Sequence, residues 1–230
     1  RQEKVEWITV RHEETAAYAA YAQAALNGRL AVCAGTVGPG ALHLINGLYN
    51  AKKERTPVLA ITGQVPTVQQ GTGYFQEVDL KKMFDDVCAY QAIIRTPEEA
   101  PRVILRAIRI ALAQGAVCRI ELPADVAAMD AAGERYIGPV PVSDAVLVPG
   151  ENSLRTAATS LDAGKHITIL AGAGCRGARE EVLRLAEKLK APIVHTFRAS
   201  DIFDHDTPGV VGLTGLIVDP PGYHAVIKAD

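Results

Sequence analysis

A pair of adjacent carboxylates stands directly behind a histidine near the start of the chain. The motif "RHEE", residues 11–14, is followed by an alanine-rich, helix-like run that ends at "NG", residues 27–28. Acidic residues are favoured in a first helical turn, which alone can explain Glu13 and Glu14. A partly desolvated carboxylate at the head of such a helix would also have a raised pKa, which suits a group that shares a proton with a heterocycle. Both interpretations remain open for this motif.

A loop rich in glycine and proline joins an apolar run to the next helix-like segment. It reads "GTVGPGALHLINGL", residues 35–48, and its Gly38 and Gly40 would let the backbone approach a ligand closely. Ligands collect at the carboxyl ends of parallel strands, although a tight strand-to-helix turn needs the same residues. His43 and Asn46 lie three residues apart on the helix, and we expect packing or capping roles for them rather than ligand binding.

Two other glycine-rich segments are candidates for binding. "GTGYFQEVDL", residues 71–80, combines glycines with adjacent aromatic residues and could close over a substrate, or be an ordinary loop. "GAGCRG", residues 172–177, matches G-x-G-x-x-G between a strand-like and a helix-like run. The acidic residue expected about 20 positions later is poorly placed, because only Asp201 follows the next strand. Dinucleotide contact and a simple glycine turn are both consistent with this motif.

Alternating strand-like and helix-like runs must position these groups. Three runs rich in Val, Ile and Leu predict strands with both faces covered: residues 29–35, 57–63 and 116–123. Three segments between them predict helices: residues 13–26, 40–53 and 97–114. Strand–helix alternation resumes near the C-terminus with residues 166–172, 179–190 and 191–197. The fold class is therefore α/β with parallel sheets, and the proline-rich stretch between the two parts predicts a linker.

The composition is that of an ordinary globular protein without a nucleic-acid footprint. The 230 residues carry 24 basic and 26 acidic side chains, for a formal charge of −2. The four cysteines lie far apart without a C-x-x-C pair, which predicts reduced thiols and no metal site built on them. No apolar run reaches the roughly 18–20 residues of a membrane span, and no signal peptide is visible. We expect a cytoplasmic protein whose two ends look like cuts through a longer chain.

Taken together, these motifs resemble the thiamine diphosphate-dependent family of pyruvate oxidase, acetolactate synthase and benzoylformate decarboxylase. The resemblance rests on "RHEETAAYAA", "GRLAVCAGTVGPGALHLINGLYNA", "TPVLAITGQVP" and "GYFQEVDL", which occur in the family's order. It extends through "KAPIVH" and "GLTGLI" and so covers nearly the whole chain. Within the family it is greatest to bacterial pyruvate oxidases of the quinone-reducing kind.

The resemblance implies roles for the residues of the first part of the chain. Glu13 matches the catalytic acid, whose carboxylate bonds to the aminopyrimidine ring and favours the imino tautomer that takes the thiazolium proton. Gly38, Pro39 and Gly40 resemble the loop that lines the pyrimidine side of the cofactor. Phe75 and Gln76 resemble the pair that reaches the neighbouring subunit's active site and contacts the substrate.

It also implies a domain plan: a pyrimidine-binding domain over residues 1–128, a linker over 129–152, and part of a Rossmann-like, flavin-type middle domain over 153–230. Two sets of residues in the last of these resemble loops that contact FAD. They are Gly172 and Gly174 of "GAGCRG", and Thr214, Gly215, Leu216 and Ile217 of "LTGLI". The family's first strand and helix, and its third domain with the "GDG" magnesium and diphosphate site, have no counterpart in the sequence, so no metal ligand is assigned and the chain alone is expected to be inactive.

The activity implied for the longer parent is oxidative decarboxylation of pyruvate with thiamine diphosphate, magnesium and FAD, and with quinone or oxygen as the final acceptor. A homodimer or homotetramer is expected, and a peripheral membrane contact of the parent stays open. Acetolactate synthase is the first alternative, although this chain reads "HLINGL" where synthases usually read "TNLITGL". A non-catalytic homologue is the second, and the retained Glu13 argues against it.

Overall fold

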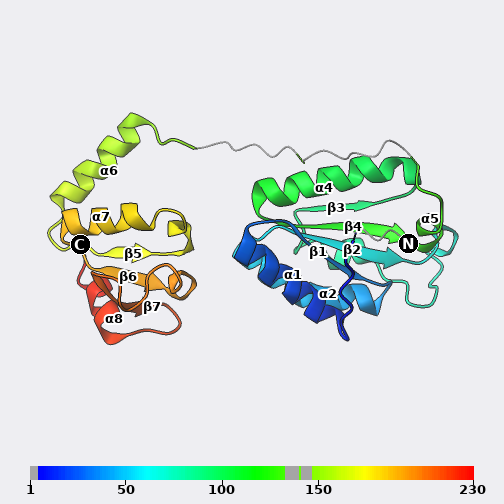
Figure 1. The fold of residues 1–230 in the computed structure, drawn as a ribbon, viewed down its shortest axis with the longest axis horizontal. Coiled ribbons are helices and arrows are strands. Elements are labelled where there is room, and N and C mark those ends of the chain that lie inside the picture. The colour runs from blue at the N-terminus through cyan, green and yellow to red at the C-terminus, as the bar shows by residue number, and fades with distance from the viewer. Residues whose placement is uncertain (1–4, 133–139, 141–146) are drawn as a thin grey trace. The chain divides into compact units, whose positions relative to one another are not determined.

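The computed structural model describes residues 5–132, 140 and 147–230, which form two compact α/β units (Figure 1). The units comprise residues 1–145 and 146–230, so the chain divides inside the range predicted as a linker. Residues 133–139 and 141–146 of that range lie outside the described residues. Each unit has its own sheet and its own buried core.

The first unit is built on a four-stranded, fully parallel sheet in the order β1-β2-β4-β3. Its strands are β1 Ala31–Gly35, β2 Val58–Gln64, β3 Tyr90–Ile93 and β4 Val117–Pro123. The three strands predicted from apolar runs are confirmed as β1, β2 and β4. Sequence patterning missed β3, because this edge strand has only four residues and each is half-buried.

Helices cover both faces of this sheet, with α1 and α2 on one side and α4 on the other (Figure 1). The three predicted helices are confirmed, and Gly28 ends α1 in the left-handed conformation with φ 67°. The third begins as a 3₁₀ turn, Pro97–Glu99, before α4. The helices are α1 Glu13–Asn27, α2 Pro39–Glu54, α3 Leu80–Met83, α4 Ala100–Gln114 and α5 Ala124–Ala127, with a further 3₁₀ turn at Thr67–Gln69.

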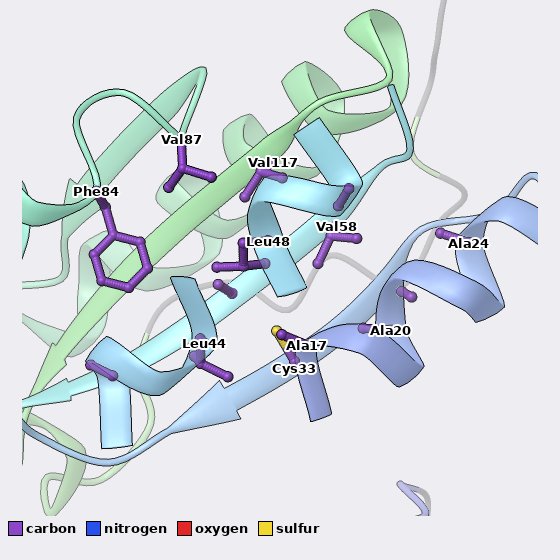
Figure 2. Packing of buried hydrophobic residues seen from close by; sticks show 14 of the residues in the cluster. Ala17, Ala20, Ala24, Cys33, Leu44, Leu48, Val58, Phe84, Val87 and Val117 are labelled. Atoms are coloured by element: carbon purple, nitrogen blue, oxygen red, sulfur yellow. The ribbon is translucent and has the colours of Figure 1, made fainter. Parts of the chain in front are cut away.

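Successive strand residues enter different cores because side chains alternate across a strand. Val58 and Ala60 of β2 pack toward α1 and α2, whereas Leu59 packs toward α4. Figure 2 shows the first of these cores, to which α1 contributes alanines and α2 contributes leucines. This double burial explains the continuous apolar runs of β2 and β4. The prediction of two covered faces is wrong for β1, because Val32 on its other face is 53% exposed.

Small residues bring α1 and α2 unusually close together. A side-chain carbon on Gly47 would lie 2.7 Å from both the Cβ of Ala17 and the backbone nitrogen of Tyr18. The alanine-rich character of α1 therefore has a structural explanation, because the helix packs on the backbone of α2. This contact fixes which side chains of the two helices face each other.

A buried polar cluster lies on the α2 side of β4. The fully buried Arg119 donates to Gln91 at 2.9 Å, to Thr62 at 2.8 Å and to Glu121 at 2.7 Å. Its guanidinium also lies 5.0 Å from the centre of the Phe84 ring. The apolar pattern of β4 gave no sign of this cluster, although alternation places positions 119 and 121 on one face.

The second unit contains a three-stranded parallel sheet in the order β5-β6-β7. Its elements are α6 Glu151–Ala163, β5 Ile169–Ala171, a 3₁₀ turn Ala173–Cys175, α7 Arg179–Leu189, β6 Ile193–Thr196, a 3₁₀ turn Phe197–Ala199, β7 Val210–Thr214 and α8 Pro220–Ile227. The predicted strands and helix are confirmed as β5, β6 and α7. The helix α6, which begins inside the predicted linker, was missed because it is almost wholly exposed and gives a weak apolar pattern.

Among the described residues, no helix combines the length and apolar character required to cross a membrane.

Candidate functional site

In the turn between β1 and α2, two glycines lie very close to the backbone of other residues. A side-chain carbon on Gly35 would lie 2.3 Å from the carbonyl oxygen of Gly40, and one on Gly38 would lie 2.5 Å from that of Gln76. Gly38 has φ 62°, a left-handed value that suits glycine, and Pro39 begins α2, where its fixed φ is favourable. The structure thus places the predicted residues 38–40 in one turn and brings Gln76 against it.

The carboxylate of Glu13 reaches the same turn from the first residue of α1. A side-chain carbon on Gly40 would lie 3.1 Å from Oε1 of Glu13, so the absence of a side chain there leaves room for this oxygen. The other oxygen, Oε2, lies 3.0 Å from Nδ1 of His43. Four predicted groups, Glu13, Gly38, Gly40 and Gln76, therefore meet at the carboxyl end of β1, where parallel sheets place their ligands.

The pKa of Glu13 is lowered, mainly because His43 hydrogen-bonds its carboxylate and secondly because its own backbone N–H does. Desolvation opposes this effect without overcoming it. The expectation of a raised pKa from burial is therefore wrong for this chain. About a third of the Glu13 side chain is exposed, and the hydrogen bonds to its charged form outweigh the effect of its partial burial.

Two side chains of α2 hold the two carboxylates of α1. His43 contacts Glu13, and the amide of Asn46 donates to Oε1 of Glu14 at 2.6 Å. We expected packing or capping roles for His43 and Asn46, and the structure gives both exposed side chains hydrogen bonds to the acids at the start of α1. Their i, i+3 spacing on one helix face, opposite adjacent acids, was the signal available in the sequence.

One group among the described residues has the residue types of a metal centre: His12, Glu13 and His43. Their ligand atoms lie within 4.8 Å of one another, whereas ligands at about 2.0–2.1 Å from a tetrahedral ion lie roughly 3.3 Å apart. The two imidazole rings are stacked at 4.4 Å, and Nδ1 of His12 accepts the N–H of Glu14 at 3.3 Å. The group is thus arranged as a hydrogen-bonded cluster.

The segment before Gln76 is held by a carboxylate that sequence reasoning did not single out. Glu77 accepts hydrogen bonds from the backbone N–H groups of Gly71, of Gly73 at 2.9 Å and of Tyr74 at 3.2 Å. Its pKa is lowered, first by the bond from Gly71. Phe75 projects from this segment with 78% of its surface exposed, available to a partner or a ligand.

Replacing Glu77 with glutamine is expected to weaken the hydrogen bonds from Gly71, Gly73 and Tyr74, because a neutral amide accepts hydrogen bonds less strongly than a carboxylate. Since the folded-state pKa is depressed, the stabilisation is present above the ordinary pKa and disappears as the pH falls through the lowered one. Amide exchange of Gly71, Gly73 and Tyr74 should lose several-fold protection at neutral pH in Glu77→Gln, with Glu187→Gln as control. Unchanged protection would contradict the assigned role.

In the second unit the predicted flavin-contacting residues lie at the carboxyl ends of the strands, which form one edge of the sheet. Gly172 follows β5, Thr214 ends β7, and Thr196 at the end of β6 pairs in register with Thr214. A side-chain carbon on Gly172 would lie 3.9 Å from Oγ1 of Thr196. Gly174 lies in the 3₁₀ turn after β5, and the segment 215–217 follows β7.

This edge carries exposed apolar side chains, and α7 begins only after the glycine motif. Phe197, Leu216 and Ile217 are all exposed. Residues of the G-x-G-x-x-G motif themselves form the 3₁₀ turn Ala173–Cys175, and a further turn follows before α7 begins at Arg179, so the helix does not start at the first two glycines. Asp201, considered as a ribose ligand, pairs with Arg176 of the turn at 2.7 and 3.0 Å.

Burial keeps three of the four thiols protonated. All four are free, and burial raises the pKa of Cys33, Cys88 and Cys118 to about 12. These thiols remain protonated at neutral pH.

Two family models match the chain, one on each unit. The model described as "Thiamine pyrophosphate enzyme, N-terminal TPP binding domain" matches residues 1–83, and "Thiamine pyrophosphate enzyme, central domain" matches residues 154–230. Thiamine pyrophosphate is the same compound as thiamine diphosphate. The first match includes Glu13, residues 38–40 and Gln76.

Curated relatives extend over the whole chain. An "uncharacterized 42.6 kDa protein in isoamylase 3'region" of Pseudomonas amyloderamosa is 42% identical over 231 residues, which is all of this chain and 58% of the relative. Pyruvate oxidase of Lactiplantibacillus plantarum is 32% identical over 231 residues, all of this chain and 38% of that enzyme. A probable acetolactate synthase large subunit of Methanocaldococcus jannaschii is 35% identical over 234 residues, 97% of this chain and 39% of the relative.

The chain thus spans between 38% and 58% of the length of these relatives. Both described units match domains of the same family, in the same order, and the clustered Glu13 and residues 38–40 fall in the matched TPP-binding domain. The chain belongs to the thiamine pyrophosphate enzyme family, of which it carries the N-terminal TPP-binding domain and the central domain.

Proposed function

We propose that this chain is part of an enzyme that oxidatively decarboxylates pyruvate with thiamine diphosphate and passes the electrons to FAD and then to quinone or oxygen. The observation that carries the proposal is the position of Glu13, whose Oε1 faces Gly40 in the turn shared with Gly38 and Gln76. A carboxylate with one oxygen held and the other facing a side-chain-free turn is suited to a flat, nitrogen-containing ring.

The cofactor, when bound, supplies the stabilised carbanion that this chemistry requires. Glu13 would hold and release a proton at Oε1 and so set the tautomer of the bound ring. Gly38 and Gly40 keep side chains out of the turn, and Pro39 fixes the start of α2. Phe75 and Gln76 are proposed as the substrate contacts, in an active site completed by a second copy of the chain in a homodimer or homotetramer.

Oxidase chemistry is favoured over carboligation by the residues around Glu13. The sequence "HLINGL", which resembles oxidases, contains His43 and Asn46, the side chains that bond to Glu13 and Glu14. The chain is 32% identical to a pyruvate oxidase and 35% identical to a probable acetolactate synthase, so these identities do not choose between the two activities. Carboligation of two 2-ketoacids is therefore the second candidate.

FAD is proposed to lie at the edge of the second sheet, against Gly172, Gly174 and residues 214–217. The exposed apolar side chains there fit a flavin ring better than solvent. We assign no residue of this chain to magnesium or to the cofactor's diphosphate, and propose that another domain of the assembly holds them.

The test uses the intact protein with thiamine diphosphate, magnesium and FAD. Pyruvate should reduce a quinone-like dye and release carbon dioxide, and omission of any one cofactor should abolish dye reduction. A parallel assay follows acetolactate. Acetolactate formation without dye reduction would replace the oxidase by the second candidate, and the absence of both products would contradict an active enzyme.

A further inference from the structure

The contact between α1 and α2 pairs two adjacent acids with two side chains of different chemistry. His43, Asn46 and Gly47 share one face of α2, because they are spaced by three and four residues. Gly47 packs on Ala17, and this close contact sets His43 opposite Glu13 and Asn46 opposite Glu14. The pairing thus follows from the packing of the two helices.

The two acids are held differently. Glu14 accepts a hydrogen bond of 2.6 Å from the side-chain amide of Asn46. This amide is neutral and does not give up a proton near neutral pH. Glu13 lies 3.0 Å from Nδ1 of His43, and an ionised carboxylate can only accept, so this nitrogen carries the proton of the bond. Only the Glu13 pair can therefore share a proton.

A second imidazole, that of His12, packs against His43. The ring of His12 stacks on the ring of His43 at 4.4 Å with an interplanar angle of 25°. His12 is fixed in turn, because it caps α1 by accepting the N–H of Glu14. His43 and His12 are the titratable groups that act on Glu13 in the described contacts.

We propose that His43 is a positioning residue for Glu13: its Nδ1–H holds Oε2, so that Oε1 alone is presented at Gly40, while Asn46 keeps Glu14 away from the site. This inference rests on the proposed function of Glu13 as the acid that meets the cofactor ring. It explains why two adjacent carboxylates do not compete for one ligand. The lowered pKa of Glu13 is consistent with it, since the His43 bond favours the ionised form and eases release of the proton from Oε1.

The variants are His43→Leu, which removes the donor, and His43→Asn, which keeps an N–H near the place of Nδ1. The matched control is His205→Asn in the second unit, where His205 also lies beside a carboxylate, 3.4 Å from Asp206. The first readout needs no cofactor: the Glu13 carboxyl is titrated in the ¹³C-labelled 230-residue chain, with Glu13→Gln assigning its signal. The second is the dissociation constant of thiamine diphosphate and the kcat and KM for pyruvate of the intact protein.

In His43→Leu the Glu13 pKa is expected to rise toward its ordinary value, and kcat to fall about tenfold with KM nearly unchanged, as for loss of one hydrogen bond to a charged group. His43→Asn should retain most of both properties, and the control should change neither. An unchanged Glu13 titration in His43→Leu would overturn the proposal, as would equal losses in His43→Leu and His43→Asn. Failure of the proposed function would show differently, as absence of pyruvate turnover in the unmodified protein with the Glu13 titration still sensitive to His43.

Discussion

Replacing Glu13 with glutamine is expected to lower pyruvate-dependent turnover of the intact protein by roughly 10²–10⁴-fold, the usual size of a positioned acid–base group. Glutamine keeps the shape of the side chain and can still contact His43, but it cannot hold and release a proton at Oε1. Because only the proton function is removed, kcat should fall far more than the affinity for pyruvate. The measurement is steady-state dye reduction at saturating cofactor.

The neighbouring acid supplies the matched control for this prediction. Glu14→Gln alters the adjacent position in the same helical turn and keeps an oxygen that can accept the amide of Asn46. Its loss of turnover should be much smaller. Equal losses in the two variants would mean that the charge of the helix start matters rather than the particular carboxylate, and would remove Glu13 from the proposed mechanism.

The largest expected effect on stability comes from the buried cluster on β4. Arg119→Met should lower the free energy of unfolding of the first unit by about 3–5 kcal/mol, because Glu121 would remain buried without its cation. Thr62 and Gln91 would lose their donor as well. Native-state hydrogen exchange of the central β4 amides measures this directly, since such amides exchange through global opening.

A double variant separates the ion pair from simple packing. Adding Glu121→Leu to Arg119→Met removes the stranded charge, so the double variant should be more stable than Arg119→Met alone. Arg184→Met breaks an exposed pair with Glu181 and should cost less than about 1 kcal/mol. If the double variant is no better than the single one, the cluster stabilises through shape and not through charge.

Apolar patterning was sufficient to predict the elements that border a large buried core. The strands β1, β2 and β4 and the helices α1, α2 and α4 all have dense cores beside them, so their sequences carry a strong signal. The edge strand β3 and the exposed helix α6 have little buried surface, and their sequences accordingly resemble loops. Burial, more than propensity, separated the elements that could be predicted from those that could not.

The candidate site was predictable in its members but not in their mutual contacts. Glu13 and residues 38–40 were identified from motifs, and the structure brings them together with Gln76. The roles of His43 and Asn46 depend on how α1 lies against α2, which single-helix patterns do not encode. The direction of the Glu13 pKa was wrong for the same reason, because it depends on a side chain 30 residues away in the chain.

The missing side chain of Gly47 sets the distance between α1 and α2 in the first unit. Gly47 lies one helical turn beyond His43, and its close contact with Ala17 and Tyr18 decides how far α1 stands from α2. A methyl group added at Gly47 would push the two helices apart and move Glu13 away from Gly40, although no residue of the turn between β1 and α2 had changed. Substitutions at Gly47 would therefore be selected against for their effect on activity, although the residue has only a packing role.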